Sequence, residues 1–171
     1  MVGVDIFISC GAEVERYREI GHNALVQIEH MFRYELDVPL AIGNWDFRRD
    51  APRIVVPGGL ATRSLSMVER TNAMIAIFGA ALPQITCQEI RKAFRLRQAG
   101  NPVEVWLFLS QQLRSRRHTD FLARIRRDFG QQVVFAQYGD ELEFQAKLFT
   151  SVIPFLLTRF RQAAVPIGDP S

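Results

Sequence analysis

Five short apolar runs alternate with five helical patterns along the chain, and this alternation constrains the fold more than any other feature of the sequence. The runs, rich in β-branched residues, predict strands at 4–9, 38–42, 73–78, 103–109 and 133–136. Apolar residues at helical spacing predict helices at 12–34, 63–71, 86–98, 111–129 and 140–163. Strands that alternate with helices form parallel sheets covered on both faces, so the sequence predicts an α/β fold of this kind.

The expected strand order is flavodoxin-like, 2-1-3-4-5, and it predicts where a ligand would bind. In this order the direction of winding reverses between the first and third strands. Ligands bind at such a switch point, outside the carboxyl ends of the strands. The residues expected there are Ser9, Cys10 and Gly11 after the first strand, and Phe78 at the end of the third.

The length of 171 residues suits a single domain with its own core, which we expect over residues 1–163. The tail at 164–171 contains Pro166, Gly168 and Pro170 and is typical of a linker. A sensor domain or a partner protein beyond this tail is one interpretation. Pro154 is expected to kink or divide the last helix, because proline removes a helical hydrogen bond.

The composition, 48% hydrophobic and 23% charged, is that of a globular protein. No apolar run approaches the ~20 residues that span a bilayer, and residues 1–5 show no secretory signal. We therefore expect a cytoplasmic protein without membrane contact. The 2 cysteines and 3 histidines show no metal-ligand spacing, so no metal site is expected.

The densest group of basic residues lies at 114–127, within the fourth predicted helix. Aromatic residues do not alternate with these arginines in the manner of a base-stacking surface. The group therefore favours a solvated helix face or a protein interface, and a nucleic-acid partner is not expected.

Glu89 lies shortly after the third predicted strand, near the start of the helix at 86–98. A carboxylate at this edge of the sheet can stabilise positive charge that develops on a ribose. The second interpretation is a capping box, in which Thr86 caps the helix and Glu89 reaches back to the Thr86 amide. The spacing of the two residues fits both interpretations.

The loop expected at 43–62 is longer than most α/β connections, and loops of this length are usually functional or disordered. It carries Trp45, Phe47 and Arg48, and an aromatic side chain beside a cation can hold a flat base and a phosphate. In the alternative interpretation, Trp45 only covers the edge of the sheet.

Three common catalytic signatures are absent from the sequence. It contains no P-loop, no G-x-G-x-x-G after a strand and no G-x-S-x-G turn. These absences argue against a P-loop nucleotidase and against a hydride-transferring dinucleotide domain.

Several segments occur together in the order and spacing of one family. They are Asp5-Ile-Phe-Ile-Ser-Cys10, Glu13-Val-Glu-Arg-Tyr-Arg18, Trp45-Asp46, Pro57-Gly-Gly59, the strand at 72–79, Thr86-Cys-Gln-Glu-Ile90 and Gly100-Asn-Pro-Val103. Over residues 4–160 the chain resembles a Toll/interleukin-1 receptor-like (TIR-like) domain of the bacterial defence-associated type. It departs from that pattern at the turn 80–83, where many members carry a glycine, and at Thr86 or Cys87, where many carry a serine.

The resemblance implies an activity and a site. Glu89 matches the glutamate that catalytic members need to cleave NAD, which implies NAD as a substrate and no separate cofactor. Nicotinamide would be released by hydrolysis or cyclisation, and the amides of residues 9–11 would hold the pyrophosphate. The residues expected to bind the substrate are Phe7, Ser9, Cys10, Gly11, Trp45, Phe47, Arg48, Phe78 and Thr86. The resemblance also implies a role in bacterial antiphage defence, with activity switched on by self-association or by a sensor.

Two other functions fit the same pattern. The first is a non-catalytic TIR-like interaction module, because members that only scaffold signalling complexes keep the fold. The second is a nucleoside deoxyribosyltransferase, which shares the sheet and uses a helix glutamate as its nucleophile. Such enzymes usually carry an acidic residue in the turn before that helix, and the segment 80–85 contains none.

Overall fold

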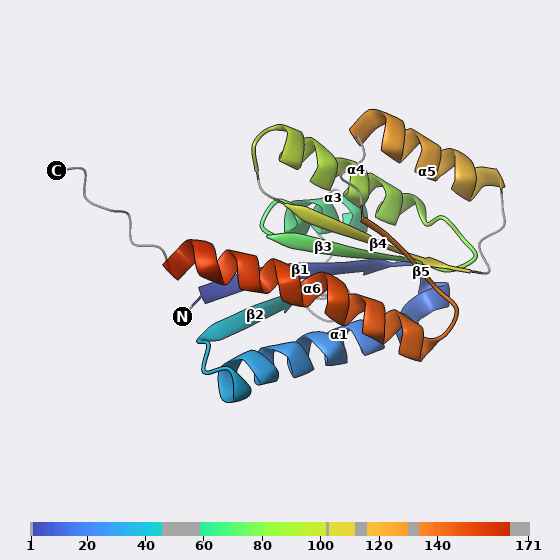
Figure 1. The fold of residues 1–171 in the computed structure, drawn as a ribbon. Coiled ribbons are helices and arrows are strands. Elements are labelled where there is room, and N and C mark those ends of the chain that lie inside the picture. The colour runs from blue at the N-terminus through green and yellow to red at the C-terminus, as the bar shows by residue number, and fades with distance from the viewer. Residues whose placement is uncertain (1, 46–58, 102, 112–115, 130–133, 165–171) are drawn as a thin grey trace.

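A five-stranded sheet forms the centre of the molecule (Figure 1). The computed structural model describes residues 2–45, 59–101, 103–111, 116–129 and 134–164. All strand pairs are parallel, and the order is β2-β1-β3-β4-β5, as the sequence predicts. The strands are β1 (Val2–Cys10), β2 (Leu40–Trp45), β3 (Ala73–Phe78), β4 (Glu104–Ser110) and β5 (Val134–Tyr138).

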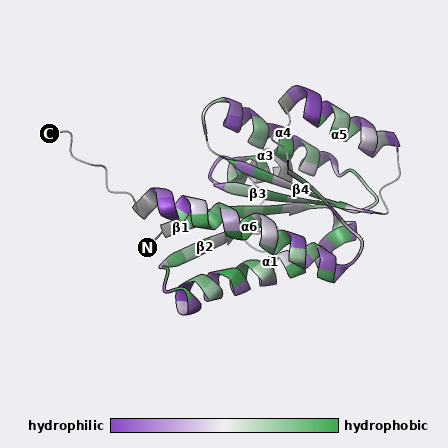
Figure 2. Ribbon diagram, in the orientation of Figure 1, coloured by the Kyte–Doolittle hydropathy of each residue, from purple (hydrophilic) through white to green (hydrophobic). Residues whose placement is uncertain are grey.

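Helices cover both faces of the sheet (Figure 1). One face carries α1 (Glu15–His30) and α6 (Glu141–Ala164), which pack against each other. A 3₁₀ turn, η1 (Ala12–Val14), precedes α1, and a π-helical turn, η2 (Met31–Glu35), follows it. The other face carries α3 (Gly59–Val68), α4 (Gln84–Gln98) and α5 (Arg116–Phe129). Hydrophobic and hydrophilic residues alternate along the helices (Figure 2). Buried hydrophobic residues of the helices join those of the strands in one core on each face of the sheet, which gives the molecule three layers.

The alternation of side chains along β1 decides which face each residue meets. Ile6 and Ile8 belong to the core under α1 and α6, whereas Phe7 belongs to the core under α3, α4 and α5. Ser9 follows Phe7 towards the α4 face, and Cys10 follows Ile8 towards the α1 face. Ser9 lies beside Ala76 of β3 in the register of the sheet, so the carboxyl ends of these two central strands meet.

The second strand and the helix after the long loop differ from the prediction. β2 begins at Leu40 rather than at residue 38, because η2 and a left-handed Asp37 (φ 52°) extend the connection before it. The amide of Val38 donates a hydrogen bond to the carbonyl of Phe32 at 2.8 Å, which holds this connection against the helix. At its other end β2 continues to Trp45, so residues 43–45 are strand rather than loop. α3 begins at Gly59 and ends at Val68, earlier than the predicted 63–71.

Pro154 does not divide the last helix, contrary to one alternative of the prediction. α6 is one helix of 24 residues with Pro154 inside it. Its buried residues Phe144, Leu148, Val152 and Leu156 recur at helical spacing on both sides of the proline. Continuous packing of this apolar stripe on the sheet outweighs the hydrogen bond that proline removes.

Candidate functional site

Glu89 lies in the second turn of α4, with its side chain directed into the molecule. α4 begins after Pro83, and the helix has no side-chain cap at that end. Thr86 therefore lies within the first turn rather than at the cap, and the capping-box interpretation is wrong. Glu89 is only 3% exposed, which is rare for a carboxylate that is not paired.

Ser9 joins Glu89 from the end of β1. Its hydroxyl donates a hydrogen bond to Oε2 of Glu89, across 80 residues of sequence. The Ser9 hydroxyl is also hydrogen-bonded to Oγ1 of Thr86, at 3.1 Å. All three side chains are at most 5% exposed. The end of β1 and the start of α4 thus bring two residues of the predicted substrate site, Ser9 and Thr86, together with the predicted catalytic residue.

Ser64 of α3 completes the set of hydroxyl groups around Glu89. Its side chain is 2% exposed and hydrogen-bonds the Glu89 carboxyl group. The sequence gives no signal for this residue, because it lies 25 positions before Glu89 on a helix that carries no motif. Only the packing of α3 against α4 reveals it.

Burial is the main electrostatic influence on Glu89. Removal from water raises the pKa of Glu89, while the hydrogen bonds from Ser9 and Ser64 oppose that rise. The next residue on α4, Ile90, belongs to the apolar core that also contains Phe7 and Phe78. A carboxyl group that is hard to ionise and surrounded by hydroxyl donors is a frequent feature of catalytic sites.

Three of the predicted substrate-binding residues are core residues or lie on the other face. Phe7 and Phe78 are at most 1% exposed and can form only the floor of a site. Cys10 points to the α1 face, where the Nε–H of the buried Arg18 donates to its sulfur at 3.1 Å. Cys10 is therefore separated from Glu89 by the sheet.

The remaining predicted residues occupy two further places. Gly11 is buried and lies at the carboxyl end of β1, where the sequence predicts it. Trp45 is the last residue of β2, and the stacking of its ring on the substrate stays a prediction. Phe47 and Arg48 lie outside the described residues, so their proposed contacts with a base and a phosphate stay predictions.

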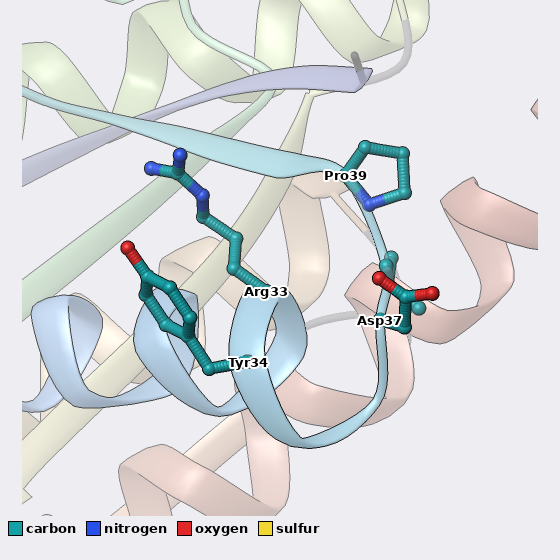
Figure 3. Close-up of a pocket in the computed structure, with 5 residues that line it drawn as sticks. Arg33, Tyr34, Asp37 and Pro39 are labelled. Carbon is teal, nitrogen blue, oxygen red and sulfur yellow. The ribbon is translucent and has the colours of Figure 1, made fainter.

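A hollow lies at the opposite, amino-terminal edge of the sheet (Figure 3). It has a volume of about 360 Å³ and lies between η2 and the start of β2. Its lining consists of Arg33, Tyr34, Asp37, Val38 and Pro39. The Arg33 guanidinium lies 5.8 Å from the centre of the Tyr34 ring. No buried titratable group lines it, so we take the Glu89 cluster as the candidate site.

The described residues contain neither a cluster of metal ligands nor a membrane-spanning helix. No group of three or more His, Cys, Asp or Glu side chains in this part of the chain could hold a metal ion. Within the same ranges, no helix is both long enough and apolar enough to cross a membrane.

Comparisons with known proteins show similarity at the level of the fold. No protein-family model matches the chain, and no curated protein does. The structure is similar to that of the CMP N-glycosidase of Clostridium botulinum, with a TM-score of 0.50 and 16% identity, over 86% of this chain and 98% of that one. It is also similar to oxidised flavodoxin 1 from Bacillus cereus, with a TM-score of 0.42 and 14% identity, over 90% and 96% of the two chains. At 16% identity the first likeness shows the shared α/β fold alone.

Proposed function

We propose that the protein is a TIR-like N-glycosidase that cleaves the bond between nicotinamide and ribose in NAD, with Glu89 as its catalytic residue. The observation that carries this proposal is the buried Glu89 carboxyl group beside the carboxyl ends of the central strands, where Ser9 and Ser64 hydrogen-bond it and Thr86 hydrogen-bonds Ser9. Ligands of this fold bind at that edge of the sheet.

The chemistry requires little beyond a well-placed negative charge. The nicotinamide of NAD carries a positive charge and leaves as a neutral base with the electrons of the broken bond, so no general acid is needed. The ribose left behind becomes cationic. A carboxylate in an apolar environment stabilises that cation far more strongly than one in water. Glu89 has such an environment, because its side chain is buried and removal from water is the main influence on its pKa.

The hydroxyl groups around Glu89 hold its carboxylate in a fixed orientation. Hydrogen bonds from Ser9 and Ser64 favour the ionised form, which is the form that opposes a cation. Water that attacks the anomeric carbon gives ADP-ribose and releases a proton. Attack by the adenine ring of the same molecule gives a cyclic product instead, and both outcomes use the same carboxylate.

One further substrate class fits a specific observation. The raised pKa of Glu89 favours the protonated acid, which could donate a proton to a neutral base as it leaves a nucleoside monophosphate. The enzyme of similar fold from Clostridium botulinum is described as a CMP N-glycosidase, which makes CMP the natural second substrate to test. The two reactions predict opposite pH dependence, because one needs the ionised and the other the protonated form of Glu89.

The biological part of the proposal rests on the TIR-like resemblance. It assigns the protein a role in bacterial antiphage defence, with activity switched on by self-association or by a sensor domain. The alternative is a TIR-like module that only binds other proteins, and it differs from the proposal by the absence of turnover.

Product identification tests the proposal. Concentrated wild type, Glu89→Gln and the surface control Glu19→Gln are incubated separately with NAD and with CMP, and the products are separated and identified by mass. We expect the wild type and the control to release nicotinamide, and Glu89→Gln to release none. Release of cytosine alone would assign the second substrate class. No product from either nucleotide would favour the non-catalytic module.

A further inference from the structure

Glu13, an exposed residue of η1, lies across the switch point between β1 and β3. Two buried glycines, Gly11 and Gly79, are the first residues after these strands. A Cβ atom added to Gly11 would collide with the Glu13 carboxylate, with Cδ of Glu13 only 2.9 Å away. A Cβ atom added to Gly79 would lie 3.1 Å from Cγ and 3.5 Å from Oε1 of the same side chain. The carboxylate of Glu13 therefore rests against both strand ends.

The local backbone explains this placement. Gly11 is extended, with φ −75° and ψ 166°, so any residue could adopt its conformation. The amide of Val14 then donates to the Gly11 carbonyl at 3.3 Å and closes the 3₁₀ turn, which returns Glu13 over the end of β1. Pro83 confines Gly11 from the other side, 2.6 Å from the added Cβ. Close approach, rather than an unusual φ angle, is what favours glycine here.

The position that Glu13 occupies is the place where many α/β folds bind a phosphate. There, backbone amides at the strand end and the first helical turn normally receive the anion. A carboxylate at the same place repels a phosphate. If a phosphate is forced against the carboxylate, both groups also lose hydrating water, which costs free energy. The expectation that the amides of residues 9–11 hold the pyrophosphate of NAD conflicts with this carboxylate.

A carboxylate is, in contrast, a good partner for sugar hydroxyl groups. Its two oxygens accept hydrogen bonds and can receive both hydroxyls of a ribose diol. Glu89 reaches the same strand end from the α4 side through Ser9, which is two residues before Gly11. A ribose placed between the two carboxylates would present its diol to one and its anomeric carbon to the other.

We propose that Glu13 is a specificity residue, which accepts the ribose hydroxyls of the substrate at the switch point and keeps phosphate away from the amides of residues 9–11. This inference rests on the proposed function for the identity of the sugar. Glu13 would then orient the substrate so that its ribose lies at the ends of β1 and β3 and its phosphates lie elsewhere.

Binding of inorganic pyrophosphate tests the exclusion of anions without any need for turnover. Wild type, Glu13→Gln and Glu19→Gln are titrated while the amide resonances of Gly11 and Gly79 are followed by NMR. Glu19 is an exposed acidic residue on α1. Glu19→Gln is the control, because it changes the net charge of the protein by the same amount as Glu13→Gln. Glu13→Gln should bind pyrophosphate roughly tenfold more tightly than the other two proteins, through those two amides. Equal affinity in Glu13→Gln and Glu19→Gln would overturn the inference.

The role of Glu13 in recognising the ribose hydroxyls is tested by turnover of NAD analogues that lack the 2′- or 3′-hydroxyl of the nicotinamide ribose. The wild type should prefer NAD over these analogues in kcat/KM by about tenfold or more, and Glu13→Gln should lose most of this preference. An unchanged preference in Glu13→Gln would refute the role of Glu13 in hydroxyl recognition. If no protein turns over NAD, the proposed function fails, and the pyrophosphate titration alone still decides whether Glu13 excludes anions.

Discussion

At the scale of single residues, the site depends on one buried carboxyl group and the hydroxyls that hold it. Ser9 and Ser64 donate to Glu89, and Ser9 is in turn hydrogen-bonded to Thr86. Burial raises the pKa of Glu89, and the two serine hydrogen bonds lower it again. The serines are therefore positioning residues, whose removal should affect the ionisation of Glu89 as well as its orientation.

Ser9→Ala should reduce the activity of the protein and shift its pH profile. A hydrogen bond to a charged group contributes ~1.5–3 kcal/mol, so kcat/KM near neutral pH should fall roughly tenfold to a hundredfold. Loss of the bond raises the pKa of Glu89 further. Because the ionised form is the active one, the acid side of the pH–rate profile should move to higher pH. Ser66→Ala, an exposed position on α3, is the control, and identical profiles for both variants would contradict the role of Ser9.

Glu89→Gln should stabilise the folded protein at neutral pH. The pKa of Glu89 is higher in the folded state than in the unfolded state, so folding favours its protonated form. The stability linked to this group is complete below the unfolded pKa and is lost as the pH rises through the folded pKa. A neutral glutamine avoids that loss. Thermal melting of both proteins should therefore show the largest difference at pH 7–8 and a small one near pH 4, and a lower melting temperature for the variant at every pH would contradict this.

At the scale of elements, the sequence predicts which helices and strands exist and their order better than it predicts the residues at which they begin and end. β3 is predicted to the residue, because six consecutive apolar residues at 73–78 are all buried. The start of β2 is missed, because η2 and the left-handed Asp37 lengthen the connection before it in a way that hydrophobic periodicity does not encode. The limits of α3 are missed as well.

The candidate site follows the same division between what the sequence encodes and what it does not. Ser9, Thr86 and Glu89 could be predicted, because strand ends and the following helix meet at one edge of a parallel sheet. Ser64 could not, since its contact with Glu89 depends on how α3 packs on α4. The side of the sheet that Cys10 faces follows from strand alternation, which separates it from Ser9.

Pro154→Ala should stabilise the protein. The proline lies inside α6 and is exposed, so its replacement restores a backbone hydrogen bond without disturbing the buried stripe. We expect an increase in the free energy of unfolding of ~1–3 kcal/mol. Ala146→Gly, at another exposed position of α6, should reduce it by ~0.5–1 kcal/mol. Denaturant unfolding of the two variants measures both changes, and a destabilised Pro154→Ala protein would show that the proline fits a bend the helix needs.

At the scale of the whole molecule, charge is unevenly divided between the two helical faces. α4 and α5 expose Arg91, Arg95 and Arg124. On the other face, η1, α1 and η2 expose more acidic than basic residues: Glu13, Glu15, Glu19 and Glu35 against Arg16 and Arg33. These faces lie on opposite sides of the sheet (Figure 1). Opposite charges on opposite faces favour association of one molecule with the next, which gives the proposed self-association a physical basis.

The activity per molecule should therefore rise with protein concentration. If association activates the protein, dilution over roughly a hundredfold range should reduce the rate more than proportionally. High salt should have the same effect as dilution, because it screens the attraction between the charged faces. The measurement is the initial rate of NAD loss at several protein and salt concentrations. A rate strictly proportional to protein concentration at every salt concentration would contradict activation by assembly.

The central claim is that Glu89 stabilises a ribosyl cation, and the rate of nicotinamide release tests it most directly. The rate is measured for wild type and Glu89→Gln at the same high protein concentration near pH 7.5, after melting curves show that both are folded. Loss of an electrostatic group aimed at developing charge typically costs about 10²–10³ in rate. We predict a loss of at least this size, whereas a folded Glu89→Gln protein that releases nicotinamide as fast as the wild type would contradict the account.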